Sequence, residues 1–159
     1  MKQQENQNYS QIKSFIMQDI KKMANRVFRQ LGSGHTEKTY QNALLAELLD
    51  NNYTAISEYI IPIQYITSKG NMRTVSNGRV DILAEKDNIA ILIELKTLPY
   101  LGRLTEHKEL LQIIKYINYL PVATSDILPM LINFPVSVPG NPGKIDSPEI
   151  FVLSMPRRD

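Results

Sequence analysis

The sequence has no cysteine, only two histidines and no long hydrophobic run. Without cysteine, disulfide scaffolds, thiol nucleophiles and Cys-ligated zinc or iron–sulfur clusters are excluded. The N-terminus is polar with no apolar segment behind it, and runs such as Ile89 to Ile93 are too short to span a bilayer. We therefore expect an intracellular protein with no signal peptide, no transmembrane segment and no membrane partner.

The motifs of several common enzyme classes are also missing. There is no G-x-S-x-G elbow and no P-loop, and Gly32-Ser33-Gly34 lacks the downstream glycine of a dinucleotide-binding fingerprint. The histidines, His35 and His107, are expected at the surface or in turns, and we assign them no catalytic role. Catalysis, if present, is therefore expected from acids and lysines.

The size of the chain is that of one domain with its own core. Its 159 residues include 43% hydrophobic and 21% charged residues, which is typical of a folded soluble protein. We expect a polar N-terminal tail over residues 1–10, a folded domain over 11–134, and a C-terminal segment over 135–159. The last segment is rich in proline and glycine, and we expect it to pack on the same domain or to extend it.

Positive charge is slight overall but uneven along the chain. A formal charge of +2 and a pI near 8.8 identify no partner by themselves. The first quarter, however, has many basic residues and few acids, and its candidate phosphate contacts are Lys21, Lys22, Arg26 and Arg29. The alternative is that these side chains form only the solvated face of an amphipathic helix.

Hydrophobic periodicity predicts a mixed α/β layout. Helices are expected over 12–31 and, capped by Ser33 or Thr36, from about 36 to 50. Strands are expected on both sides of a turn at 68–71, then over 80–84, where Gly78-Arg79 opens a new strand, and over 89–97. The last predicted elements are a helix over 104–120, a strand over 127–134 whose ladder starts at Met130 because of Pro129, and a short edge strand over 150–153. The predicted order, α-α-β-β-β-β-α-β, places helices over a central sheet.

The hairpin over 80–97 carries the most informative polar residues. If Asp87-Asn88 is a two-residue turn, Asp81 lies directly opposite Glu94, and Lys96 shares a face with Glu94. A shift of one residue at the turn would break this opposition. The predicted register therefore gathers two carboxylates and one ammonium on one patch of the sheet.

Two facing carboxylates in an apolar hairpin repel each other and lose hydration, so a cation would stabilise them. A hard divalent cation such as Mg²⁺ suits an oxygen-rich site of this kind. Such a metal activates water and stabilises the charge of phosphodiester hydrolysis, while Lys96 is placed to steady the nucleophile or the developing charge. The alternative is a salt bridge of Lys96 with Asp81 or Glu94 on a solvent-facing sheet.

Several motifs together resemble a known family. The stretch LGSGHTEKTYQNALLAELL contains Gly-x-x-Glu-x-x-Tyr, and it is followed by GRVDIL, IELK, ELLQIIKYINYL and LINF. This order resembles the GxxExxY proteins of the PD-(D/E)XK nuclease superfamily, from about Val27 to Phe134. The resemblance implies a restriction-endonuclease-like core, in which a central mixed sheet is flanked by helices.

The resemblance also implies roles for individual residues. Asp81 and Glu94 would be metal ligands, Glu37 a helix acid assisting the metal site, and Lys96 the catalytic lysine. Gln112 matches the helical glutamine that follows the lysine in many members. No proline precedes Asp81, which is a departure from the family pattern, but no metal ligand is missing.

Further residues are expected around that site. Tyr116 matches the tyrosine one helical turn beyond the glutamine. Tyr40 is expected in the core or the wall of the site, because it lies on the apolar stripe of its helix. Arg73 and Arg79 are candidate phosphate contacts on the strands before Asp81.

The function expected from these residues is hydrolysis of DNA phosphodiester bonds by a nuclease that uses Mg²⁺, with Mn²⁺ as a substitute. The single-domain size favours recognition of DNA shape, such as branches or ends, and cutting two strands favours a homodimer. One alternative is a non-catalytic nucleic-acid-binding or assembly protein that retains the fold. Another is an interaction protein that docks through its proline-rich segment, 135–148.

Overall fold

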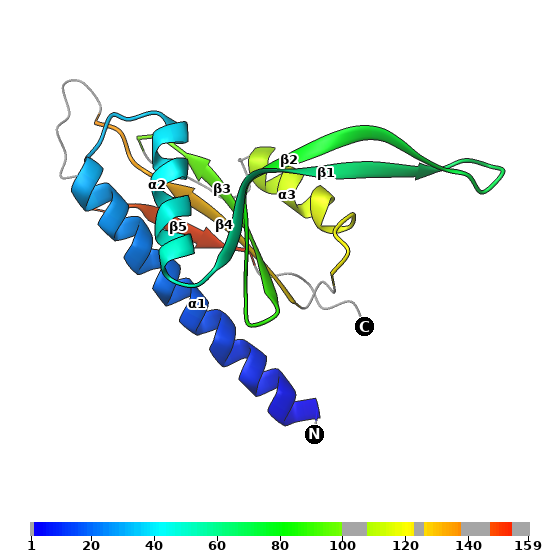
Figure 1. Ribbon diagram of the computed structural model, residues 1–159, viewed down its shortest axis with the longest axis horizontal. Coiled ribbons are helices and arrows are strands. Elements are labelled where there is room, and N and C mark those ends of the chain that lie inside the picture. The colour runs from blue at the N-terminus through cyan, green and yellow to red at the C-terminus, as the bar shows by residue number, and fades with distance from the viewer. Residues whose placement is uncertain (1, 100–107, 123–125, 138–146, 154–159) are drawn as a thin grey trace.

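The computed structural model describes residues 2–99, 108–122, 126–137 and 147–153. Its helices and strands in chain order are α1 (Lys2–Leu31), α2 (Glu37–Asp50), β1 (Thr54–Ile66), β2 (Met72–Lys86), β3 (Ile89–Lys96), α3 (Lys108–Ile117), β4 (Ile127–Asn133) and β5 (Glu149–Val152). Figure 1 shows the helices on the two sides of one sheet.

The strands form a five-stranded mixed sheet in the order β1-β2-β3-β4-β5. All neighbouring pairs are antiparallel except β3 and β4, which are parallel and are connected through α3. A parallel pair needs such a crossover, whereas antiparallel neighbours need only a turn. The predicted class, a mixed α/β fold consistent with a restriction-endonuclease-like core, is confirmed.

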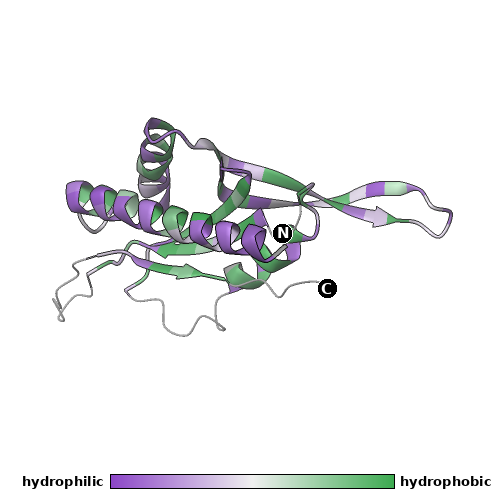
Figure 2. Ribbon diagram, turned by 90° about the horizontal axis from the view of Figure 1, so that it is seen from below, coloured by the Kyte–Doolittle hydropathy of each residue, from purple (hydrophilic) through white to green (hydrophobic). Residues whose placement is uncertain are grey.

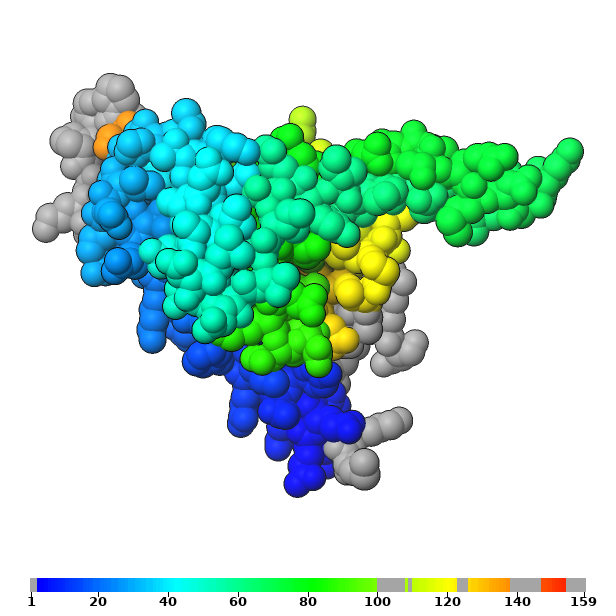
Figure 3. Space-filling view, viewed as in Figure 1, coloured from blue at the N-terminus to red at the C-terminus, as the bar shows by residue number. Residues whose placement is uncertain are grey.

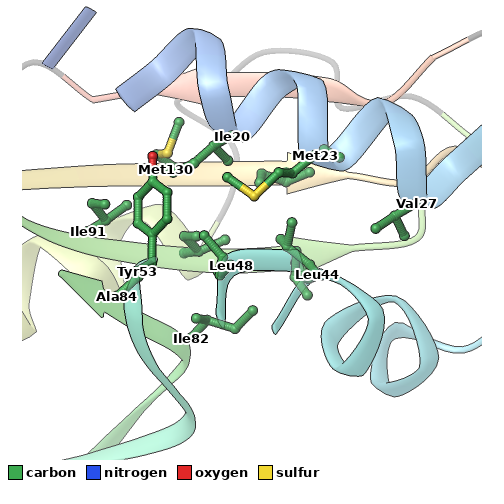
Figure 4. Close-up of a cluster of buried hydrophobic side chains, with 14 of the residues drawn as sticks. Ile20, Met23, Val27, Leu44, Leu48, Tyr53, Ile82, Ala84, Ile91 and Met130 are labelled. Carbon is green, nitrogen blue, oxygen red and sulfur yellow. The ribbon is translucent and has the colours of Figure 1, made fainter. Parts of the chain in front are cut away.

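Two hydrophobic clusters hold the helices on opposite faces of the sheet. Under α1 and α2, the first cluster includes Ile20, Leu44 and Leu48 packed on strand residues such as Ile82 and Ile91 (Figure 4). Under α3, the second cluster comprises Ile61, Val80, Ala90, Leu92, Leu110, Ile113, Ile117, Ile127 and Leu131. Because β3 and β4 contribute to both clusters, they are buried on both faces, and Figure 2 shows their apolar colour.

The start of α2 follows from local sequence chemistry. Gly32 and Gly34 have φ of 74° and 94°, a backbone region that glycine enters without a steric cost, so the chain turns sharply after α1. Thr36 then caps α2, because its hydroxyl accepts a hydrogen bond from the N–H of Thr39 at 3.3 Å. The predicted helix and one of its two candidate caps are thus confirmed.

The structure differs from the predicted strands in β2. The chain was expected to begin a new strand at Gly78, but β2 runs without a break from Met72 to Lys86. A Cβ at Gly78 would lie 2.3 Å from Cε1 of Tyr116, so the tyrosine ring occupies the space that a side chain would fill. This glycine therefore permits close packing of α3 on the strand and does not end it.

Two other boundaries also differ, and a third lies outside the described residues. Residues expected in a polar tail are helical, because α1 begins at Lys2, although positions 3–11 remain exposed. The ladder of β4 begins at Ile127 and includes Pro129, which pairs with Leu92 of β3. Residues 104–107, the start of the predicted third helix, lie outside the described residues, as does His107.

The β1–β2 hairpin continues beyond the helices. Figures 1 and 3 show its far end projecting from the body as a twisted two-stranded ribbon. Its last pair is Ile66 with Met72, and a register shift between Ile63 and Gln64 interrupts the ladder on the way. A bulge of this kind increases the local twist of a ribbon.

Candidate functional site

Asp81 and Glu94 meet where the regular β2–β3 ladder ends. The turn at Asp87 and Asn88 has φ of 51° and 61°, and the pairing runs from Lys86 with Ile89 to Ile82 with Ile93. The next opposed pair in this register is Asp81 and Glu94, so the predicted turn and register are confirmed.

Side chains take over the hydrogen bonding at this junction. The backbone N–H of Asp81 donates to Oε1 of Glu94 at 3.2 Å. In return, the N–H of Leu95 donates to Oδ2 of Asp81 at 2.8 Å. Each carboxylate therefore accepts a bond from the other strand, and these bonds orient both acids at the strand ends.

The sheet is also distorted on the other side of Asp81. Residues two apart in a regular strand share a face, yet Val80 packs under α3 whereas Ile82 packs under α1 and α2. In β1, Glu58 lies at the position opposite Asp81, has φ of 54° and is absent from the ladder. The strand therefore twists at Asp81, which separates the catalytic candidate from regular pairing on both sides.

Glu58 is an acid that sequence reasoning missed. Its Oε1 lies 3.1 Å from Nζ of Lys38 and 3.9 Å from Nη1 of Arg79. The hydrogen bond and positive charge of Lys38 lower the pKa of the Glu58 carboxyl, so Glu58 stays ionised. Only the long-range pairing of β1 with β2 brings it opposite Asp81, and no local motif marks it.

The electrostatics of the junction favour a bound cation. Burial, together with the negative charge of Asp81, raises the pKa of Glu94 from 4.5 to about 8, and the charge of Lys96 opposes this shift. Loss of hydration and the neighbouring charge of Asp81 both disfavour the ionised form of Glu94, and a bound cation would favour it. Two carboxylates in such a setting are the donor set that a divalent metal prefers.

Lys96 is placed by the β3–β4 pairing. Its carbonyl accepts a hydrogen bond from the N–H of Phe134 at 2.8 Å. Opposite it, buried Asn133 holds the chain just beyond β3: its Oδ1 accepts from the N–H of Leu98 at 2.8 Å, and its Nδ2 donates to the Leu98 carbonyl at 3.0 Å and to Glu149 at 2.7 Å. Asn133 thus supports the position of Lys96, a role that the LINF motif alone did not indicate.

Glu37 is the first residue of α2 and is exposed. Its neighbour Lys38 reaches Glu58, which places this end of α2 over the distorted part of β1. In the described part of the chain, no group of three or more acids or histidines is close enough to hold a metal. The structure therefore brings Asp81 and Glu94 together, while the role of Glu37 stays a prediction.

Tyr40 and Tyr116 have structural positions. Tyr40 is fully buried, stacks on Phe134 at a ring distance of 4.5 Å, and donates a hydrogen bond from its hydroxyl to the carbonyl of Gly32 at 2.6 Å. It thereby joins the helix turn to the core, one of its two expected places. Tyr116 covers Gly78 at the base of the ribbon, and Gln112, one helical turn before it, is exposed.

A second residue missed by sequence reasoning is Gln41, on α2 one turn after Glu37. Its side chain is only 4% exposed, and its Nε2 has no hydrogen-bond partner among the residues that the structure describes. A buried amide donor without a partner is costly and marks a position where a water or ligand is expected. A polar residue on an otherwise apolar, sheet-facing stripe was the available signal.

The candidate phosphate contacts are exposed but not equivalent. Arg26 pairs with Glu47 on α2 at 3.1 Å, and Arg79 lies near Glu58. Lys21, Lys22 and Arg29 lie on the outer face of α1, and Arg73 lies on the projecting ribbon. The structure thus separates these residues into a helical group and a ribbon group.

A mixed sheet between helices, with two acids and a lysine at the open end of its central hairpin, defines the architecture of a restriction-endonuclease-like domain. Comparison with known families agrees: the model of the PD-(D/E)XK nuclease superfamily matches residues 14–142. The chain belongs to the PD-(D/E)XK nuclease superfamily. Among curated proteins, no match to the chain reaches significance. Within the described residues, no helix is both long and apolar enough to cross a membrane.

Proposed function

We propose that the protein is a metal-dependent nuclease that hydrolyses DNA phosphodiester bonds. The observation that carries the proposal is the junction of Asp81 and Glu94, where two hydrogen-bonded carboxylates face each other with Lys96 two residues along the same strand. Membership of a nuclease superfamily supports this chemistry. The match to the Gly-x-x-Glu-x-x-Tyr motif further supports assignment to the GxxExxY proteins.

Asp81 and Glu94 would hold Mg²⁺, or Mn²⁺ in its place, and Glu37 would assist them through water. The donor set fits, because both groups are carboxylates, and burial together with the charge of Asp81 raises the pKa of Glu94, which a bound cation would oppose. When bound, the metal supplies an activated water and charge stabilisation at the phosphate. Binding of a cation also favours loss of the proton from Glu94.

We propose the following roles for residues of the protein other than the metal ligands. The ammonium of Lys96 stabilises negative charge that develops on the phosphate oxygens. Asn133 supports the strand end that carries Lys96 by its hydrogen bonds to the backbone of Leu98. Gln112 orients the substrate from α3, and the buried Nε2 of Gln41 donates to a water or phosphate oxygen near Glu37.

DNA is the substrate that we propose, with branched DNA or ends as preferred forms and a homodimer as the cutting unit. The basic side chains of α1 are candidate contacts for the duplex backbone. Superfamily membership supports a nucleic-acid substrate of this kind.

The test is cleavage of labelled linear, single-stranded and four-way-junction DNA with Mg²⁺, Mn²⁺ or EDTA. We expect metal-dependent cutting that is lost in Asp81→Asn and Lys96→Gln. Asp87→Asn is the matched control, because it removes an acid from the opposite, turn end of the same hairpin where asparagine tolerates the positive φ. DNA binding without cutting in either metal would instead support the non-catalytic nucleic-acid-binding alternative.

A further inference from the structure

The projecting part of the β1–β2 hairpin, residues 60–79, is here named the ribbon arm. It continues directly from the strand that carries Asp81, and its last pair, Ile66 with Met72, lies far from the helices (Figures 1 and 3). From Asp81 to Met72 the strand spans about 30 Å at about 3.3 Å per residue. The arm is therefore long enough to contact a partner well away from the catalytic junction.

The charge of the ribbon arm is of one sign. From Tyr59 to Val80 the chain contains Lys69, Arg73 and Arg79 and no aspartate or glutamate. The acids Glu58 and Asp81 flank this stretch on either side, so the charge changes sign where the arm meets the body. An arm that carries positive charges and no negative ones, and that begins beside a proposed phosphodiesterase site, favours a polyanion as its partner.

The arm also exposes large apolar side chains, which a folded protein normally buries. Although Ile61 at its base is buried, five of its large apolar and aromatic residues are 57% to 63% exposed, namely Ile60, Tyr65, Ile66, Met72 and Val75. Figure 2 shows polar and apolar residues intermixed along it. Proteins that follow a DNA groove combine basic side chains with apolar ones that contact sugars and bases.

The arm is held in shape before any partner binds. At its tip, the N–H of Thr67 donates to the carbonyl of Asn71 at 2.9 Å, and Gly70 donates back to Thr67 at 2.8 Å. Midway, Gln64 and Thr74 join their side chains across the strands at 3.0 Å. At the base, Tyr116 packs on Gly78. Binding would thus cost little ordering of the backbone.

We propose that the ribbon arm lies along duplex DNA on one side of the scissile phosphate and contacts about nine base pairs. This inference rests on the proposed function for the position of the scissile phosphate. A two-stranded ribbon fits the major groove, and about 30 Å corresponds to about nine base pairs at about 3.4 Å each. A second copy of the arm is a poorer occupant, because two surfaces of the same charge repel.

Two kinds of variant test the arm. In the first, residues 64–75 are replaced by Asn-Gly, which joins the paired residues Ile63 and Ser76 by a two-residue hairpin turn. In the second, Lys69→Gln and Arg73→Gln are combined, and the matched control combines Lys108→Gln and Lys115→Gln, which remove the same charge from exposed positions of α3. Folding of each variant is checked by circular dichroism and thermal unfolding.

Binding is measured in EDTA, without turnover, on duplexes of 10 to 40 base pairs, and the bound length is measured by footprinting. We expect the shortened arm to reduce the footprint by about four base pairs on one side only, because the strand from Ser76 to Met72 spans about 13 Å of the arm. The Lys69/Arg73 double variant should weaken binding between tenfold and a hundredfold at 0.1 M salt and lower the salt slope by about two, with no such change in the α3 control.

An unchanged footprint and salt slope in both arm variants would overturn the proposal, whether or not the protein cleaves DNA. Unchanged DNA binding with loss of a dimer, measured by light scattering, would assign the arm to a second copy and overturn it equally. Arm-dependent binding without cleavage in any metal would support the arm and contradict the proposed nuclease activity. The two inferences therefore fail separately.

Discussion

The two ends of the β2–β3 hairpin use opposite means to hold the same pair of strands. At the closed end, a tight turn at Asp87 and Asn88 and an unbroken backbone ladder join β2 to the apolar residues 89–93 of β3, which are buried on both faces. At the open end, the carboxylates of Asp81 and Glu94 replace the ladder and accept backbone bonds across the gap. The closed end is built for stability, whereas the open end keeps polar groups in a buried place where they cost stability and support chemistry.

The largest effect on stability is expected at the closed end. Ile91 is fully buried in the cluster under α1 and α2. Ile91→Ala removes packed methyl groups and leaves a cavity, which should cost about 2–5 kcal/mol of unfolding free energy. Urea unfolding measures this loss, and cleavage at low temperature should stay close to that of the wild type. A fall in the cleavage rate that exceeds the fall in folded fraction would contradict the assignment of the closed end to stability alone.

At the open end, substitution of Lys96 is expected to lower the cleavage rate and to leave stability nearly unchanged. Lys96→Gln keeps most of the side-chain volume and removes the charge, so single-turnover cleavage should fall by about 10²–10³-fold. Unfolding free energy should change by less than about 1 kcal/mol, because the backbone bond to Phe134 and the support from Asn133 remain. A variant that loses stability but keeps its rate would show that Lys96 has a structural role.

The pH dependence of the metal-free protein provides a third contrast. Because the pKa of Glu94 is raised from 4.5 to about 8, the folded state keeps a proton that the unfolded chain has lost between these values. Stability should therefore be highest below about pH 4.5 with respect to this group, decline by up to about 1.4 kcal/mol per pH unit, and level off above about pH 8.

Thermal unfolding in EDTA against pH measures this decline, and Glu94→Gln should flatten it. Ca²⁺ or Mg²⁺ at pH 8 should raise the melting temperature of the wild type but have little effect on Glu94→Gln, because the cation binds the folded state. A wild-type profile that rises between pH 5 and pH 8 through this group would contradict the assigned direction.

Among the substitutions expected to change the unfolding free energy, the smallest effect is expected at Gln41. Gln41→Leu removes a buried amide whose Nε2 has no partner in the described part of the chain, so it should stabilise the protein by about 1 kcal/mol. If the amide serves the site as we propose, cleavage should fall at the same time. Gln41→Glu is a useful second variant, because it keeps the shape but removes the donor. Lower stability in Gln41→Leu would indicate that the amide already has a partner, such as a buried water.

Much of the site could be predicted because its determinants are local. The register of Asp81 and Glu94 depends only on a two-residue turn and strand alternation, both readable over 81–94. The cap at Thr36 is equally local. In contrast, Gly78 was taken for a strand boundary because the residue that covers it, Tyr116, comes from a helix much later in the chain.

By itself, the amino-acid sequence determined the hairpin register, the helix boundaries around Thr36 and the order of motifs that marks the superfamily. These depend on periodicity and on neighbours within a few residues. Only the tertiary structure decided that Glu58 lies opposite Asp81, that Asn133 supports Lys96, and that the β1–β2 ribbon leaves the body as an arm. These features arise from pairing and packing between distant segments, for which no single stretch of sequence carries a signal.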